Sequence, residues 1–127
     1  MESNLLNISE AYLQAWNDKD VDQIARYVHP DVRFVGPMSQ TTGKDAFLQG
    51  AKRMFGLLQE IKVQSKFASD SQAIFTYDFV CAQPIGVCRT AELITFTDGL
   101  ISGVEIFFDA RPFEKMMLAQ KAAAASA

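Results

Sequence analysis

The sequence predicts an α+β fold in which helices come first and antiparallel strands follow. Apolar residues recur every three or four positions in stretches before residue 60, and alternate with polar residues from Ile61 onward. The first pattern is typical of helices and the second of strands. The chain has 127 residues, the usual size of one domain. Its 49% hydrophobic and 21% charged residues are ordinary for a globular protein and exclude disorder.

Two helices are expected at the N-terminus. The first is marked by an apolar stripe at helical spacing: Leu5, Ile8, Tyr12 and Ala15/Trp16. The polar run 17–20 breaks this pattern, and Asp20 is a good N-cap for a short second helix. We expect Pro30 to end that helix, because the residue before a proline avoids helical backbone angles.

A short strand and a third helix come next. Residues 32–35 predict a strand that Gly36-Pro37 closes, and residues 41–44 predict a loop that leads into a helix. That helix carries a second apolar stripe: Phe47, Ala51, Met54, Phe55 and Leu58.

Four strands are expected in the second half of the chain. In the first of them Ile61, Val63, Ser65 and Phe67 share one face. The next strands are predicted at about 73–82, from the turn at 84–86 to Thr97, and at 100–109. Asp98-Gly99 is a strong hairpin signal between the last two. The predicted element order is therefore α-α-β-α-β-β-β-β.

One domain is predicted over residues 1–112, followed by an Ala-rich tail over 113–127 that we expect to be partly helical or frayed. The net charge of −3 argues against a nucleic-acid partner, which would require clustered Lys and Arg. No apolar run approaches the roughly 18 residues of a membrane span, so neither a membrane nor a nucleic acid is an expected partner. We expect a soluble, cytoplasmic protein.

Metal and cofactor signals are weak. His29 is the single histidine and lies far in sequence from Cys81 and Cys88, so no metal site is predicted. We expect the two cysteines to be reduced, half-buried thiols. The sequence contains no phosphate-binding loop or dinucleotide fingerprint, and we therefore expect no cofactor.

Several segments, in this order, resemble the NTF2-like superfamily, and the SnoaL-like and ketosteroid-isomerase-like branch in particular. The segments are 12–20, 29–34 with Gly36-Pro37, Gly43, 91–96, 98–101 and 105–109. The resemblance extends over about residues 5–112. It implies a cone-shaped sheet wrapped around the first and third helices, an apolar pocket inside the cone, and a homodimer formed through the outer face of the sheet.

The resemblance also implies roles for individual residues. Tyr12 matches the oxyanion-donating tyrosine of the isomerases, and Glu92 falls near their buried, protonated carboxylic acid. Their general base is an aspartate before a proline, but here Gly36 precedes Pro37. Asp109 could match the acidic residue of the polyketide cyclases. The Asp-Arg-Asp set of the epoxide hydrolases has counterparts in residue type only: Asp78, Arg89 and Asp109.

We therefore predict Tyr12, Glu92 and Asp109 as catalytic residues. The expected pocket residues are Trp16, Phe34, Phe55, Ile94, Phe96 and His29. Each has a purely structural alternative: Tyr12 as a core tyrosine, Glu92 on an outward strand face, and Asp109 paired with an arginine.

The predicted function is the binding of a small apolar molecule that carries a carbonyl or hydroxyl group. Proton-transfer chemistry without a cofactor, of the isomerase, cyclase or hydratase type, would accompany it. The alternative is a catalytically silent dimeric binding or interaction module, which Gly36 in the place of the base favours.

Overall fold

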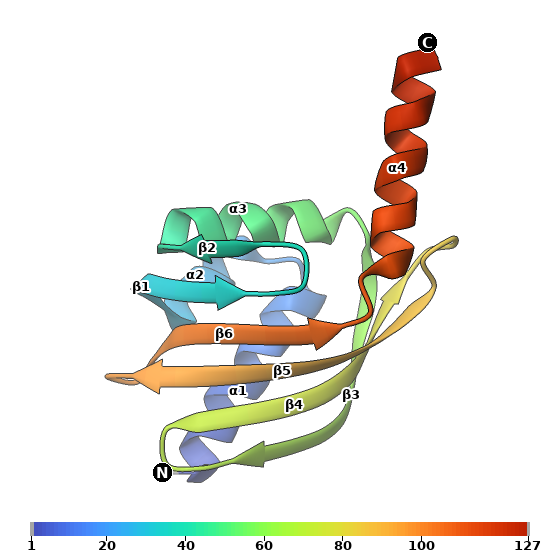
Figure 1. Ribbon diagram of the computed structural model, residues 1–127. Coiled ribbons are helices and arrows are strands. Elements are labelled where there is room, and N and C mark those ends of the chain that lie inside the picture. The colour runs from blue at the N-terminus through green and yellow to red at the C-terminus, as the bar shows by residue number, and fades with distance from the viewer. Residues whose placement is uncertain (1, 127) are drawn as a thin grey trace.

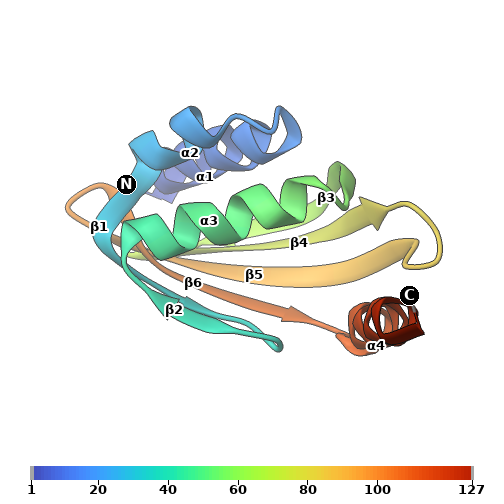
Figure 2. The same cartoon turned by 90° about the horizontal axis from the view of Figure 1, so that it is seen from above.

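Six strands form one curved sheet whose concave face is covered by three helices (Figures 1 and 2). The computed structural model describes residues 2–126. Its elements are α1 (Glu2–Asn17), α2 (Val21–Tyr27), β1 (Val28–Val35), β2 (Gln40–Thr42), α3 (Lys44–Phe55), β3 (Leu58–Ala68), β4 (Gln72–Cys81), β5 (Val87–Thr97), β6 (Leu100–Phe108) and α4 (Arg111–Ser126). The prediction of an α+β cone is confirmed.

The sheet has the order β2-β1-β6-β5-β4-β3. Strands β3 to β6 form an antiparallel meander, while β1 pairs with β6 in parallel and with β2 antiparallel. Two local predictions are confirmed. Asp98 and Gly99 both have positive φ in the β5–β6 turn, and the Asp20 side chain accepts a hydrogen bond from the Gln23 N–H at the start of α2.

The region between the second and third helices differs from the prediction. Pro30 does not end α2, which stops at Tyr27; it lies inside β1, where pairing with β6 is irregular between Val28 and Arg33. A residue without an N–H is tolerated at such an interruption. Residues 40–42, within and next to the predicted loop, form β2 because they pair with the free edge of β1, a long-range contact that local propensity does not reveal.

Burial alternates regularly along β4 and β5. Phe75, Tyr77 and Phe79 face the helices from β4, and Glu92 and Ile94 do so from β5. On β3 the predicted alternation fails, because the pairing register with β4 shifts between Val63 and Ser65. Such a bulge reverses the faces of the residues that follow, and Phe67 is consequently 65% exposed on the outer side of the sheet.

The tail is a continuous helix, α4, that stands away from the body of the molecule (Figure 1). Its alanines have the highest helix propensity, which accounts for helix where the sequence suggested partial fraying. Its first turns pack on the domain through the buried Phe113 and the half-buried Met116. Within residues 2–126, no helix is long and apolar enough to cross a membrane.

Candidate functional site

A cavity of about 590 Å³ lies between α3 and the concave face of the sheet. Residues from α1, the end of β1, β2, α3, the four strands of the meander and the first turns of α4 line it. Most of the lining is apolar or aromatic, and this volume is within the usual range for small-molecule sites. Figure 2 shows α3 across the concave side of the strands, with α4 beyond the end of β6.

Glu92 provides the one carboxyl group among the described residues that line this cavity. It belongs to the inward-facing set on β5 and is only 4% exposed. The Tyr77 hydroxyl, from the neighbouring strand β4, donates a hydrogen bond of 2.6 Å to Glu92 Oε1. Within residues 2–126, Glu92 Oε2 has no hydrogen-bond partner, so this oxygen remains available to a ligand or a water molecule.

The environment raises the pKa of Glu92 from 4.5 to about 7. Burial is the main cause, since it disfavours the charged carboxylate. The hydrogen bond from Tyr77 and the nearby Tyr12 hydroxyl oppose this effect by stabilising the ionised form. Near neutral pH the carboxyl group is therefore present in both protonation states, which suits a group that gives and takes a proton.

Tyr12 faces the same carboxyl group from α1. It is 1% exposed and packs edge-to-face on Trp16, with ring centroids 6.5 Å apart. Burial, and then the charge of Glu92, raise the pKa of Tyr12 well above its usual value. The same two causes raise the pKa of Tyr77. Both hydroxyls therefore stay protonated and act as hydrogen-bond donors in the cavity wall.

The structure brings four of the predicted site residues to the cavity: Tyr12, Trp16, Phe34 and Glu92. It does not bring Asp109 there. Asp109 follows the end of β6, is exposed, and accepts hydrogen bonds from the Arg111 guanidinium at 2.6 to 3.1 Å. Mainly because of these hydrogen bonds, its pKa is lowered from 3.8 to about 2. This arrangement matches the structural alternative given for Asp109, in which it pairs with an arginine.

The other four expected pocket residues also lie outside the cavity lining. Phe55 packs against the indole of Trp16, with ring centroids 5.5 Å apart. Ile94 and Phe96 do face inward but lie further along β5 than Glu92, where core side chains fill the space. His29 is on β1, and its Nδ1 accepts a hydrogen bond from the Asp31 N–H.

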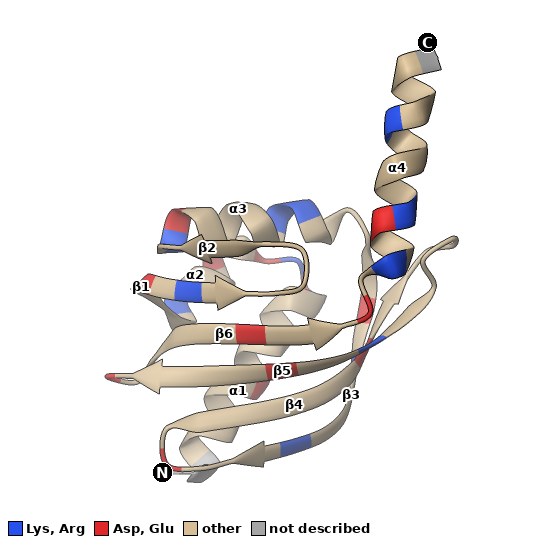
Figure 3. Cartoon of the chain, viewed as in Figure 1, with Lys and Arg blue, Asp and Glu red and all other residues tan. Residues whose placement is uncertain are grey.

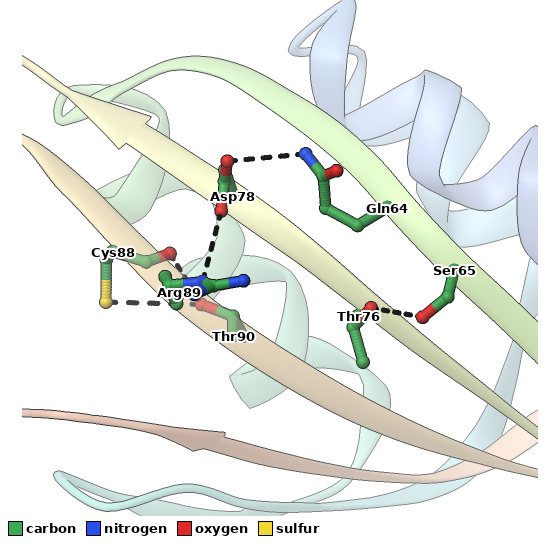
Figure 4. A network of polar contacts seen from close by, with 7 residues as sticks. All are labelled: Gln64, Ser65, Thr76, Asp78, Cys88, Arg89 and Thr90. Carbon is green, nitrogen blue, oxygen red and sulfur yellow. Dashed lines mark hydrogen bonds and ion pairs between the residues drawn. The ribbon is translucent and has the colours of Figure 1, made fainter.

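The epoxide-hydrolase-like set is not assembled in the cavity either. Asp78 and Arg89 form a 4.0 Å ion pair, and Gln64 donates a hydrogen bond to Asp78 (Figure 4). This pair lies on the outer side of the sheet, because strand alternation directs Asp78 opposite to its neighbour Tyr77.

Tyr77 is the functional candidate that the sequence analysis missed. Its signal was present in the alternation Ala73, Phe75, Tyr77, Phe79, which places it on the buried face of β4. The contact with Glu92 depends on the β4–β5 register, in which Tyr77 is opposite Thr90 and thus diagonal to Glu92.

Gly36 occupies the position at which the resemblance expects a general base. A Cβ atom there would lie 2.9 Å from Ile106 Cγ2 and 3.2 Å from the Phe34 ring. A side chain at this position would therefore require Ile106 and Phe34 to shift. Among the described residues, no group of three His, Cys, Asp or Glu side chains is arranged to hold a metal ion.

Comparison with known proteins identifies related folds. The profile of the SnoaL-like domain family matches residues 9–104. A crystal structure of a protein from Kribbella flavida is 29% identical, with a TM-score of 0.85 over 94% of this chain and 98% of that one. A second K. flavida protein, with a provisional ketosteroid isomerase assignment, is 17% identical (TM-score 0.77; 85% and 79% covered).

An epoxide hydrolase of the LEH-like type from M. tuberculosis is 18% identical, with a TM-score of 0.74 over 98% of this chain and 97% of that one. At identities this low, the likeness to the isomerase and the hydrolase establishes the fold alone. No curated protein matches the sequence closely enough to suggest a function.

Proposed function

Since this chain belongs to the SnoaL-like domain family, we propose that its cavity binds a small apolar molecule with a carbonyl or hydroxyl group and that Glu92 exchanges a proton with it, without a cofactor. One observation carries the proposal: a buried carboxyl group whose Oε1 is held by Tyr77 and whose Oε2 is unpartnered in a cavity wall.

Ionised Glu92 would remove a proton from the carbon next to a ligand carbonyl. The electrons of the broken C–H bond form a carbon–carbon double bond, and the carbonyl oxygen gains the negative charge. The Tyr12 hydroxyl donates a hydrogen bond to that oxygen. Protonated Glu92 then returns the proton to the same carbon or, in a conjugated ligand, to another carbon.

Proton exchange on a simple ketone tests this proposal. We expect the protein to accelerate deuterium uptake from D2O at the acidic carbons of 2-tetralone, measured by NMR. Glu92→Gln should reduce the accelerated rate by at least about a hundredfold, the usual contribution of a general base. Asp109→Asn, a second carboxyl group exposed outside the cavity, is the matched control and should keep the rate. Equal rates in the wild type and Glu92→Gln would contradict the proposal.

The silent binding module is the second candidate, and a specific observation favours it. Gly36 stands in the place of the base, and a larger residue there would clash with Ile106 and Phe34 unless they moved. In that case 2-tetralone would bind without any acceleration of exchange, and Glu92→Gln would change affinity alone.

We also propose a homodimer formed through the outer face of the sheet. Within residues 2–126 no helix covers this face (Figure 2), and it carries Phe67 and Phe107, which are 65% and 49% exposed. Light scattering should give a dimer mass for the wild type and a monomer mass for Phe107→Glu. Leu118→Glu, which changes an equally apolar exposed residue on α4, is the control and should leave the mass unchanged.

A reducing compartment, the cytoplasm, is the proposed location. Cys81 and Cys88 are both buried and free, and burial raises the pKa of the Cys81 thiol to about 11. Such thiols behave as small apolar side chains. Fractionation of cells that produce the chain, followed by thiol labelling under denaturing conditions, would test both the location and the redox state.

A further inference from the structure

The side of α3 that faces the cavity has an unusual composition. Gly50 lies in the interior of this helix, and Arg53 follows one turn later on the same side. Both residues line the cavity. The opposite wall is formed by the strands, including Glu92 on β5. The cavity therefore has a glycine and a cation on one wall and a carboxyl group on the other.

Gly50 leaves empty space over the helix backbone. A Cβ atom built at this position would have no atom within 4 Å outside its own helix and chain neighbours. A glycine inside a helix makes the helix less stable than an alanine would, and packing does not require a glycine at this position. The missing side chain thus extends the cavity to the backbone of α3, where a flat apolar group could lie.

Arg53 brings a positive charge to the same wall. It is exposed, and within residues 2–126 it forms no ion pair, although the chain has 15 acidic residues against 12 basic ones. The helix dipole favours a basic residue in the last turn of α3, but Lys52 satisfies that preference equally. Of the two, only Arg53 lines the cavity. Figure 3 shows this basic turn at the end of α3 on the side of the molecule where α4 lies.

Neighbouring polar groups complete this end of the cavity. Gln49 precedes Arg53 by one helical turn, and Gln120 comes from α4; both belong to the lining. Their amide N–H groups can donate hydrogen bonds to an anion alongside the guanidinium. Glu92, the single acidic residue among the described lining residues, belongs to the other wall and is buried.

We infer that the ligand of this cavity is an amphipathic anion: an apolar ring system lies against Gly50, its carbonyl or hydroxyl group meets Glu92 and Tyr12, and its carboxylate or similar anionic group pairs with Arg53. This inference rests on the proposed function of the cavity and specifies the chemical class of its ligand. The cavity positions both polar ends of such a molecule, which fixes the orientation in which it binds.

Two fluorescent probes that share one ring system test whether the cavity prefers a ligand with a negative charge. 8-Anilinonaphthalene-1-sulfonate carries an anionic group, and N-phenyl-1-naphthylamine is the same ring system without it. We expect Arg53→Gln to weaken the binding of the sulfonate about fivefold, as for an exposed ion pair. The binding of the neutral probe should stay unchanged. Lys52→Gln, which removes the adjacent charge outside the lining, should affect neither probe.

Substitutions at Gly50 test where the ring system lies. Gly50→Leu should weaken the binding of both probes at least tenfold, because the leucine side chain would fill the space that the rings occupy. Gly50→Ala provides a readout that a purely structural role would not give: the Tm should rise through better helix propensity while both probes bind more weakly.

The outcomes separate the two proposals. If the neutral probe binds and is lost in Gly50→Leu, but Arg53→Gln weakens both probes equally or neither, the anion inference is wrong and cavity binding stands. Unchanged binding in Gly50→Leu would show that the rings lie elsewhere, which also overturns the inference. If neither probe binds the wild-type protein, the anion inference is wrong; the proposed function stands if 2-tetralone exchange is still accelerated and fails as well if it is not.

Discussion

Two carboxyl groups of this protein lie in opposite environments. One is in the cavity wall at β5, and the other is at the junction between β6 and α4. Glu92 is buried with one hydrogen bond from a tyrosine, and its pKa rises to about 7. Asp109 is exposed beside Arg111, and its pKa falls to about 2. Both were acid/base candidates from sequence. The difference teaches that burial without a cation, rather than residue type, prepares a carboxyl group for proton exchange near neutrality.

The largest expected effect is on stability as a function of pH. Ionising buried Glu92 costs the folded state about 3 kcal/mol, because its pKa is raised from 4.5 to about 7. The unfolded chain binds fewer protons than the folded one between these values, so wild-type stability should fall as pH rises from 4.5 to 7. Glu92→Gln removes this slope and should be more stable than the wild type at pH 8. Urea unfolding at pH 5 and pH 8 measures the difference, and parallel profiles would contradict it.

The hydrogen bond from Tyr77 is the next test of the cavity environment. Tyr77→Phe leaves Glu92 Oε1 without its donor, which should lower the unfolding free energy by about 1–3 kcal/mol. It should also raise the pKa of Glu92 further, since this hydrogen bond favours the ionised form. NMR titration of the side-chain carboxyl carbons would follow that pKa. A pKa below that of the wild type would show that Tyr77 does not hold the carboxylate.

Packing at Gly36 is expected to have a smaller effect. Gly36→Ala should destabilise the protein by about 1–2 kcal/mol, because its Cβ would meet Ile106 Cγ2 at 2.9 Å. Ile106→Leu removes that methyl group and should rescue part of the loss in the double variant. Gly50→Ala, whose Cβ meets nothing within 4 Å, is the matched control and should not destabilise. Thermal unfolding of the four variants separates overpacking from a general intolerance of alanine.

The smallest effect is expected at Asp109. Asp109→Asn should not measurably change unfolding at pH 7 and physiological salt, because the Asp109–Arg111 pair is exposed and screened. Any small contribution of its lowered pKa to stability, below what unfolding measures at pH 7, is lost as the pH falls from 3.8 toward 2. A large loss of stability or of proton exchange at pH 7 would place Asp109 in the functional site after all.

Most of the fold could be predicted because its signals are local. Helical spacing, strand alternation, the Asp20 cap and the Asp98-Gly99 turn depend on residues close in the chain, and the structure contains all four. The errors occur where pairing with a distant strand decides the outcome. The strand β2 needs the edge of β1, and the exposure of Phe67 follows from a register shift against β4.

The sequence by itself determined the fold class and the order of the helices and meander strands. Only the tertiary structure decided that Glu92 faces inward and is joined by Tyr77, that Asp109 pairs with Arg111 outside the cavity, and that a side chain at Gly36 would clash with its neighbours. The physical reason is the sequence distance over which each feature is decided. Backbone periodicity is set by neighbours in sequence, whereas hydrogen-bond partners, burial and the resulting pKa values arise from residues that the sheet register brings together from distant parts of the chain.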